Sequence, residues 1–349
     1  MDPELIVDLY DELYSQPVTL TDPHLNHVGW NSSITRQPYT DEQMREWRDG
    51  VVDIVVRYHP RAVLDVGCGT GMVLLAVSDQ CESITGVDVS RAGIEWLSGI
   101  VGDDPRVRLT VGSADRLDSL ELPSCDLVVM NSVSQYLGPL TRFEHVVDLM
   151  IAQVRPGGHV VLGDLVSGPQ RRLMVEIAES IRGPGGGQPS LGDRVERRLA
   201  LDEELVLDPQ WARDLVGRHP RVASVSVETR TGQAATEMNL FRFDVIIDVD
   251  TPARGDPPEL DLDPTRSGWL SGVDPQIGGT VRGLGHAGLL RLAKWAGIDG
   301  PSGIARWADP GRLKQEIRHA GLDMRARPNA DDPVWRFDLV VFKDSGRVS

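Results

Sequence analysis

Short apolar runs alternate with amphipathic stretches over the first half of the chain. The apolar runs predict strands, and the stretches between them predict helices over 72–80, 91–101 and 139–154. The strands are expected over 62–67, 83–89, 106–112, 126–131 and 158–164. Because these runs are continuously apolar, each strand is predicted to be buried on both faces. Strands that alternate with helices are typical of an α/β fold, with a mostly parallel sheet covered on both sides.

Outside this alternation, the pattern predicts a cover segment, an insertion and an extension. Residues 1–60 are expected to be a helical cover segment, in which Asp41 is a helix N-cap and Met44 and Trp47 share one face. Residues 61–249 are predicted to form the core, with a helical and loop insertion at about 169–220.

The insertion contains the sequence GPGGGQPS at 183–190, which we interpret either as a lid over a site or as a plain surface connection. Strands are expected again at 222–229 and 240–249. Residues 250–349 are predicted to form an α+β extension. Its parts are an Asp- and Pro-rich linker at 250–268, helices around 285–297 and 309–320, and a final strand at 335–342.

Composition excludes several classes of partner. The 349-residue chain carries a net charge of −16, whereas nucleic-acid binders usually show a basic surface, so no nucleic-acid partner is expected. No apolar run approaches the roughly 20 residues of a membrane span. The N-terminal sequence MDPELIVDLYDELY lacks the features of a signal peptide, so we expect a cytoplasmic location and no membrane partner. Cys68, Cys81 and Cys125 show no metal-ligand spacing, and we predict no metal site.

The sharpest local feature is the sequence VLDVGCGTG at 63–71, where a predicted strand runs into a glycine-rich turn before a helix. Gly67, Gly69 and Gly71 allow the backbone to approach a ligand closely, and the following helix offers free N–H groups. Such a turn suits any mononucleotide-like ligand, NAD included.

Two details favour S-adenosylmethionine over a dinucleotide. Met72 stands where the dinucleotide motif GxGxxG requires a small residue. Asp65 lies at the strand end, where a carboxylate suits a ligand with an ammonium group and repels a pyrophosphate. Asp88 ends the second strand and can accept both ribose hydroxyls of either ligand. Asp115, after the third strand, fits the adenine amino group.

Polar residues also gather at the predicted ends of the next two strands. Asn131, Gln135 and Tyr136 follow the fourth strand, and Asp164 ends the fifth. Ligands of open α/β sheets bind outside the carboxyl ends of the strands, so this edge is the expected site.

Together these stretches resemble the N-methyltransferase domains of nonribosomal peptide synthetases. The resemblance runs from about residue 22 to 342, and its most specific stretches are GWNSS, NSVSQY and ELVLDP. The matching sequences are GWNSSITRQPYTDEQMREW (29–47), VLDVGCGTG (63–71), GVDVS (86–90), NSVSQYL (131–137), RPGGHVVLGDL (155–165), EELVLDP (203–209), FRFDVII (241–247) and DPGRLKQEI (309–317).

The resemblance implies a Rossmann-like class I methyltransferase core with a mostly parallel seven-stranded sheet, and S-adenosylmethionine as cofactor. It also implies methyl transfer to the amino nitrogen of an amino acid or of a carrier-bound aminoacyl group in natural-product metabolism. Catalytic roles are expected for Tyr136, Asn131 and Glu237. The residues expected to bind the cofactor are Trp30, Asp65, Gly67, Cys68, Gly69, Gly71, Asp88, Val89, Ala114, Asp115, Asn131 and Ser132.

The sequence departs from the family near the expected acceptor. The family triplet His-Asn-Glu becomes Ala235-Thr236-Glu237, and an arginine that commonly follows the GDV motif becomes Val166. Such domains usually lie inside larger synthetases, whereas the resemblance covers nearly all of this chain. We therefore expect this chain to act in trans or on a free metabolite. C- or O-methylation of a free aromatic or amino-acid-derived molecule is the main alternative. A non-catalytic binding protein and an NAD-dependent oxidoreductase are further alternatives, and a homodimer stays open.

An amine must lose a proton around the transfer step, and a phenol or carbon acceptor needs a firmer general base. The candidates for this base are Tyr136, Glu237, Asp164, His24 and His27.

Overall fold

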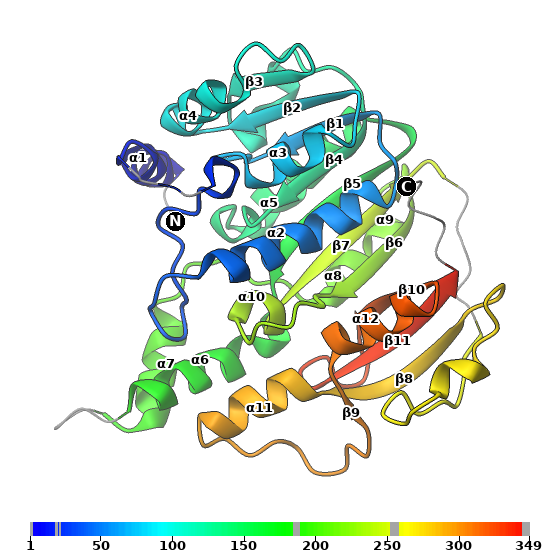
Figure 1. The fold of residues 1–349 in the computed structure, drawn as a ribbon. Coiled ribbons are helices and arrows are strands. Elements are labelled where there is room, and N and C mark those ends of the chain that lie inside the picture. The colour runs from blue at the N-terminus through cyan, green and yellow to red at the C-terminus, as the bar shows by residue number, and fades with distance from the viewer. Residues whose placement is uncertain (1–2, 18–19, 21, 184–188, 252–257, 344–349) are drawn as a thin grey trace.

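Seven of the predicted apolar runs pair into one sheet. The computed structural model describes residues 3–17, 20, 22–183, 189–251 and 258–343. The strand order is β3-β2-β1-β4-β5-β7-β6, and only β7 runs antiparallel to its neighbours (Figure 1). The strands are β1 (Ala62–Val66), β2 (Ser83–Asp88), β3 (Val107–Val111), β4 (Cys125–Asn131), β5 (Val154–Val166), β6 (Val222–Thr229) and β7 (Arg242–Val249). This order and pairing confirm the predicted Rossmann-like α/β fold.

Helices cover both faces of this sheet, because successive strand residues point to opposite sides. On one face, Val63 and Val129 pack against α2 (Asp41–Val56), α3 (Met72–Ser78) and α4 (Arg91–Val101). On the other face, Leu64 and Val128 pack against α5 (Leu140–Gln153), α8 (Pro209–Arg213) and α9 (Leu215–Arg218). The continuous apolar runs of the sequence are explained by this burial on both sides.

The N-terminal segment is only partly helical. Its helices are α1 (Pro3–Tyr14), a 3-10 turn η1 (Pro23–Leu25) and α2. The prediction that Asp41 caps α2 was wrong. Thr40 is the N-cap, because its side chain accepts a hydrogen bond from Gln43 N while the Gln43 side chain accepts one from Thr40 N. Asp41 is the first residue of the helix itself.

The insertion after β5 forms α6 (Gly168–Arg182) and α7 (Leu191–Ala200), which lie side by side at the lower left of Figure 1. Most of the glycine-rich stretch between them, residues 184–188, lies outside the described residues. The short helix α10 (Glu237–Leu240) precedes β7, so the strand expected from residue 240 begins at Arg242.

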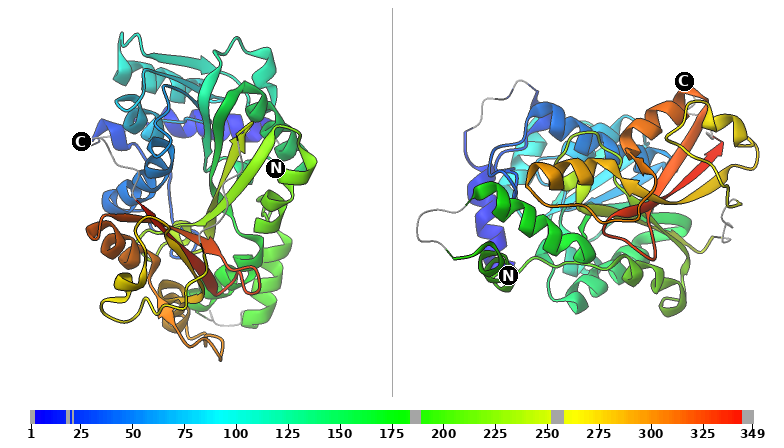
Figure 2. Two further views of the ribbon diagram at one scale, coloured as in Figure 1. Left: turned by 90° about the vertical axis from the view of Figure 1, so that its right-hand side faces the viewer. Right: turned by 90° about the horizontal axis from the view of Figure 1, so that it is seen from below.

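The C-terminal extension forms a second sheet, of order β10-β11-β8-β9. Its strands are β8 (Gly279–His286), β9 (Trp307–Ala308), β10 (Leu322–Pro328) and β11 (Arg336–Lys343), and its helices are η4 (Trp269–Gly272), α11 (Ala287–Trp295) and α12 (Pro310–His319). Figure 2 shows these elements, in yellow, orange and red, gathered on one side of the molecule. The sequence analysis missed β8 and β10, and residues 252–257 of the expected linker lie outside the described part.

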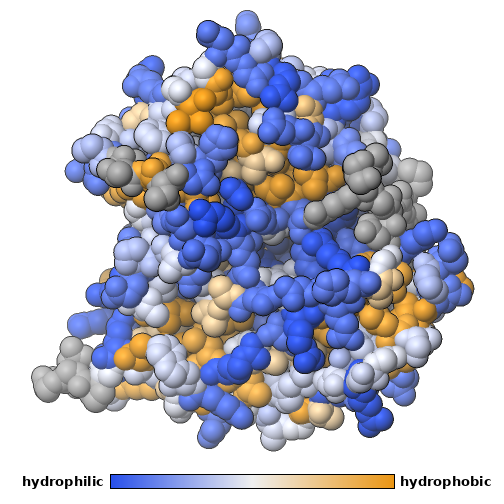
Figure 3. All heavy atoms as spheres, in the orientation of Figure 1, coloured by the Kyte–Doolittle hydropathy of each residue, from blue (hydrophilic) through white to orange (hydrophobic). Residues whose placement is uncertain are grey.

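Ion pairs join this extension to the core. Glu228 of β6 is buried between Arg57, after α2, and Arg325 of β10, at 2.8 and 3.3 Å. A cleft between α2 and α12 lies beside these residues, and charged side chains of both signs line it. The hydrophilic colouring at the centre of Figure 3 marks this region. Within the described residues, no helix is long and apolar enough to cross a membrane.

Candidate active site

The glycine-rich turn after β1 is a tight backbone cradle. Gly67, Gly69 and Gly71 all have positive φ, at 75°, 53° and 86°. Such angles are costly for residues with a Cβ atom. A Cβ on Gly67 would also lie 2.3 Å from Cγ2 of Val133, which lies across the turn. These glycines keep the carboxyl end of β1 open for a ligand.

Two carboxylates face this cradle from neighbouring strands. Asp65 of β1 is 2% exposed, and its Oδ2 atom has no hydrogen-bond partner. Burial, and to a lesser extent the charge of Asp88, raise the pKa of Asp65 to about 7. Asp88 ends β2, and it accepts hydrogen bonds from Gly69 N at 2.7 Å and Ser90 N at 2.8 Å. Burial nevertheless raises the pKa of Asp88 above its usual value.

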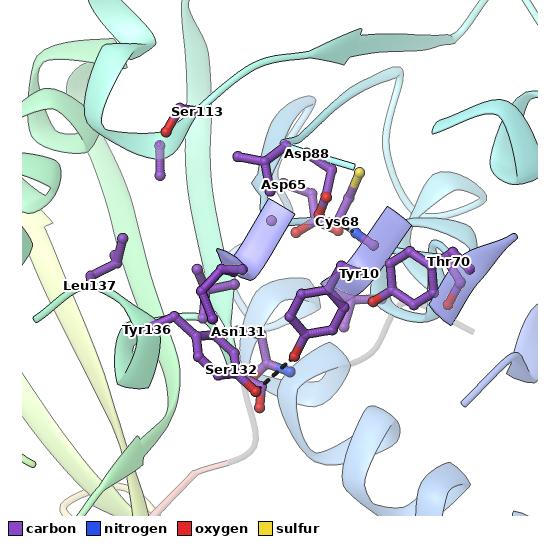
Figure 4. Close-up of a pocket in the computed structure, with 18 of the residues that line it drawn as sticks. Tyr10, Asp65, Cys68, Thr70, Asp88, Ser113, Asn131, Ser132, Tyr136 and Leu137 are labelled. Atoms are coloured by element: carbon purple, nitrogen blue, oxygen red, sulfur yellow. Dashed lines mark hydrogen bonds between the residues drawn. The ribbon is translucent and has the colours of Figure 1, made fainter. Parts of the chain in front are cut away.

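These groups open into a cavity of about 1090 Å³, part of which is open to solvent. Figure 4 shows Asp65, Cys68 and Asp88 together on one side of this cavity, with Asn131, Ser132 and Tyr136 on another. Eleven of the predicted site residues line it: Trp30, Asp65, Gly67, Cys68, Gly69, Asp88, Val89, Ala114, Asn131, Ser132 and Tyr136.

Helix α1 covers the cavity, which the sequence analysis did not predict in residue detail. Its residues Ile6, Val7, Tyr10 and Tyr14 contribute to the lining. The hydroxyl of Tyr10 donates to the hydroxyl of Tyr136 at 2.7 Å, as the dashed line in Figure 4 marks. The helical spacing of these four residues in the sequence indicates that they share one face of an amphipathic helix. It does not indicate which surface of the core that face would cover.

A carboxylate also fastens α1 to the core. Asp11 accepts hydrogen bonds from Ser90 Oγ at 2.6 Å and from Ala92 N at 3.0 Å, at the N-terminus of α4. The bond from Ser90 is the largest cause that holds the pKa of Asp11 below its usual value. An anion at this position also interacts favourably with the helix dipole of α4.

The other end of the cavity is aromatic and neutral. Trp30 and Trp47 lie with ring centroids 4.7 Å apart. The indole nitrogen of Trp47 and both side-chain polar atoms of Asn131 are buried without hydrogen-bond partners. Buried polar groups are normally paired, so these atoms are available to a bound molecule.

Three predicted site residues lie outside the lining. Gly71 is the N-cap of α3, and Asp115 is held by Arg142 and Ser113 at 2.8 and 2.6 Å. Arg142 itself lines the cavity. Glu237 is buried on α10, where it binds the backbone and side chains of residues 32–33.

Of the other candidate bases, Tyr136 lines the cavity, whereas His24, His27 and Asp164 lie outside the lining. His27 pairs with Asp41 at 2.9 Å, and His24 lies exposed in η1. Asp164 is 1% exposed at an irregularity in the pairing of β5 with β7, between Arg230 and Arg242, each 3.9 Å away. Among the described residues, no group of three or more His, Cys, Asp or Glu is arranged to hold a metal ion.

Comparison with known proteins indicates the class of enzyme. A family model described as a methyltransferase domain matches residues 63–158, which contain the glycine turn, Asp88 and Asn131. The chain is 31% identical over 255 residues to the probable non-canonical nonribosomal peptide synthetase CymA of Salinispora arenicola, covering 72% of this chain and 3% of that protein. It is 26% identical over 317 residues to chondramide synthase cmdD of Chondromyces crocatus, covering 86% of this chain and 8% of that protein.

The chain therefore spans less than a tenth of the length of these relatives. Among solved structures, the N-methyltransferase NodS from Bradyrhizobium japonicum WM9 with S-adenosyl-L-homocysteine aligns at a TM-score of 0.44 and 15% identity. That alignment covers 70% of this chain and 98% of NodS.

The fold, the cavity and the family match define the class of the protein. It is an S-adenosylmethionine-dependent methyltransferase with a class I fold. Within this class, it resembles the methyltransferase regions of nonribosomal peptide synthetases, as the predicted motifs indicated.

Proposed function

We propose that this methyltransferase transfers the methyl group to the amino nitrogen of an amino acid or of a carrier-bound aminoacyl group. The observation that carries this proposal is the neutral character of the cavity around Trp30, Trp47 and Asn131. Within the described lining, the carboxylates are Asp65 and Asp88, at the glycine turn, and there is no histidine. The candidate base that does line the cavity, Tyr136, already accepts a hydrogen bond from the Tyr10 hydroxyl. An amine can lose its proton to solvent, whereas a phenol or a carbon acid needs a nearby general base.

The glycine-turn end fits the cofactor. The unpaired oxygen of Asp65 suits the ammonium of the methionine moiety, and it gains a partner there that the ligand-free protein lacks. Asp88 lies where both ribose hydroxyls can donate to it. Val89 and Ala114 line the part of the cavity next to Asp88, and Ser113 and Arg142 border it, so the adenine is assigned there.

The methyl group is then assigned to the end that Trp30, Asn131 and Tyr136 border. When bound, S-adenosylmethionine supplies a methyl group on a sulfonium, which an acceptor lone pair displaces from sulfur as the carbon–sulfur bond breaks. Asn131 Oδ1 can accept an N–H of the acceptor and aim its lone pair at roughly 3–3.5 Å from the methyl carbon. The acceptor amine loses one proton to solvent before it enters, so that its lone pair is free, and the methylated ammonium product loses a second proton to solvent after it leaves. The indoles of Trp30 and Trp47 line this position.

The relatives support the acceptor class. The proteins that match over most of this chain are named as peptide synthetases or as the synthase of a named natural product. An aminoacyl acceptor is consistent with those names and with the small, mostly uncharged methyl end of the cavity.

The test is methylation of two acceptor sets by the purified protein with S-adenosylmethionine. One set holds free amino acids and their aromatic derivatives, and the other holds aminoacyl groups loaded on a carrier protein. Mass spectrometry with fragmentation then locates the added methyl. We expect it on the amino nitrogen. Methylation on oxygen or carbon would overturn the proposed amino acceptor and favour the alternative of a C- or O-methyltransferase, which the altered residues Ala235 and Thr236 suggest. The assignment as an S-adenosylmethionine-dependent methyltransferase would still hold.

A further inference from the structure

Residues 29–40 form a closed loop that carries Trp30 to the cavity. Tyr39 N donates to Trp30 O at 3.3 Å, and Ser32 N donates to Gln37 O at 2.9 Å. Asn31 and Pro38 form an antiparallel bridge between these bonds. The loop is the dark-blue turn that descends at the left of Figure 1, between α1 and α10. Because hydrogen bonds join the two sides of the loop, a change in the position of its tip also changes the position of Trp30.

Glu237 holds the tip of this loop. Its carboxylate accepts hydrogen bonds from Ser32 Oγ at 3.0 Å, from Ser33 Oγ at 2.9 Å and from Ser33 N. Burial raises the pKa of the Tyr39 hydroxyl, and the charge of Glu237 and a hydrogen bond to it raise that pKa further. Glu237 is 3% exposed, so these bonds form away from water, where they are strong.

Two arginines hold the same tip from the opposite side. Arg198 and Arg182 donate to the carbonyl oxygen of Ser33 at 3.0 and 3.3 Å. Both guanidinium groups also bind Glu179, a buried carboxylate of α6. Ser33 is therefore fixed at its amide, hydroxyl and carbonyl, and the insertion helices α6 and α7 are tied to the loop.

The residue after Glu237 strengthens the same attachment through apolar contact. Met238 belongs to the buried cluster beneath Trp30, which also contains Tyr39, Met44 and Trp47. Helix α10 thus fixes the loop twice, with a carboxylate at the tip and a side chain below the indole.

We propose that Glu237 is a positioning residue, a latch that holds the 29–40 loop so that Trp30 closes the cofactor cavity. The inference rests on the proposed function, because it takes this cavity to be the cofactor site. It replaces the catalytic role that the sequence analysis gave to Glu237. Three donors from Ser32 and Ser33, with the Tyr39 hydroxyl, occupy the carboxylate, and the side chain does not line the cavity.

The test is the affinity for S-adenosylhomocysteine, measured by calorimetry, because this ligand requires no acceptor. The variants are Glu237→Gln, Ser33→Ala and the double variant. The amide of Glu237→Gln turns an N–H₂ group towards the Ser33 or Ser32 donors, so the latch is lost with little change of shape. We expect affinity to fall about tenfold, and the double variant to bind no more weakly than Glu237→Gln, because both changes break one interaction.

Asp338→Asn is the matched control. Asp338 is another buried carboxylate that accepts from a backbone amide, Gly283 N, and from a side chain, Asn329, but it belongs to the C-terminal sheet. This variant should lower the melting temperature and leave the affinity for S-adenosylhomocysteine unchanged. The control separates a loss of fold stability from a loss of cover over the cavity.

The outcomes distinguish the latch from its alternatives. Unchanged affinity in Glu237→Gln and Ser33→Ala, with wild-type protein binding normally, overturns the latch alone. If affinity is unchanged but Glu237→Gln abolishes turnover and alters the pH profile of methyl transfer, Glu237 is the general base and the latch is overturned. If the wild-type protein does not bind S-adenosylhomocysteine, both the latch and the proposed cofactor site fail. Ser33→Ala removes a single hydrogen-bond donor, so it keeps the test decisive if Glu237→Gln does not fold.

Discussion

Asp65 combines a raised pKa with an unpaired oxygen, and this combination predicts how cofactor binding depends on pH. With a pKa of about 7 in the ligand-free protein, Asp65 is mostly protonated at pH 6. Pairing with the ligand's ammonium requires the ionised form, so binding below pH 7 must release a proton. We expect affinity for S-adenosylhomocysteine to fall by up to about tenfold between pH 8 and pH 6, measured by calorimetry in buffers of different ionisation enthalpy.

The variant Asp65→Asn isolates this group from Asp88, whose pKa is also raised by burial. It should bind more weakly at pH 8 and lose most of the dependence on pH. The folding stability of the ligand-free protein depends on pH in the opposite direction. The raised pKa of Asp65 contributes stability below its unfolded value of 3.8, and this contribution is lost as the pH rises through about 7. Wild-type affinity that is equal at pH 6 and pH 8 would contradict the assigned partner of Asp65.

Residues could be predicted from the sequence where one short segment determines both their position and their chemistry. Asp65, Asp88 and the glycines follow directly from strands that end at the same sheet edge. Asp115 follows from the same logic, yet Arg142 of α5 pairs with it, and Arg142 rather than Asp115 lines the cavity. Glu237 was singled out as a residue, but its role depends on a contact with Ser33, far away in sequence, which no local pattern encodes.

At the scale of elements, α1 is a cover whose attachment rests on Asp11. Replacing Asp11 with alanine removes the bonds to Ser90 and Ala92 at the N-terminus of α4. Loss of such a cap costs about 1 kcal/mol, so the open form of α1 should be populated about fivefold more. We expect S-adenosylhomocysteine to dissociate several-fold faster, measured by stopped-flow fluorescence.

The control for this change is Asp8→Ala on the same helix. The Asp8 side chain is exposed, so its loss should leave the dissociation rate unchanged. Equal rates in Asp11→Ala and Asp8→Ala would show that α1 does not gate the cavity.

Elements were predictable where hydrophobic pattern and burial agree. All seven strands of the large sheet were expected. The apolar runs of β1, β2, β4, β5 and β7 are buried by helices on both faces, whereas the edge strands β3 and β6 are only partly buried. Strand β8 was missed because its sequence, GTVRGLGH, contains three glycines, which weaken any strand pattern. Strand β10 was missed although LDMRARP alternates polar with small or apolar residues, which is a sign of a strand buried on one face only.

At the scale of the whole molecule, a buried ion cluster joins the core to the C-terminal extension. The two guanidinium groups of Arg57 and Arg325 outweigh burial and hold the pKa of Glu228 below its usual value. Replacing Glu228 with glutamine leaves both arginines without their shared charge partner. Breaking a buried pair in this way costs about 3–5 kcal/mol, which should appear as a marked fall in melting temperature.

The surface pair of Arg61 and Glu82 supplies the comparison. Its side chains are 74% and 65% exposed although their atoms lie 2.8 Å apart. Glu82→Gln should leave the melting temperature almost unchanged, because water screens the pair. Similar melting temperatures for Glu228→Gln and Glu82→Gln would show that the cluster does not join the two parts.

A crystal structure of the protein with S-adenosylhomocysteine would show directly whether this cavity is the cofactor site. We expect the ligand's ammonium at Asp65, its ribose hydroxyls at Asp88, its adenine between Val89 and Ala114, and its sulfur towards Trp30 and Asn131. Helix α1 and the 29–40 loop should remain closed over it, with Glu237 still bound to Ser33. A ligand bound outside this cavity, or reversed so that its sulfur faces Arg142, would contradict the assignment of the site.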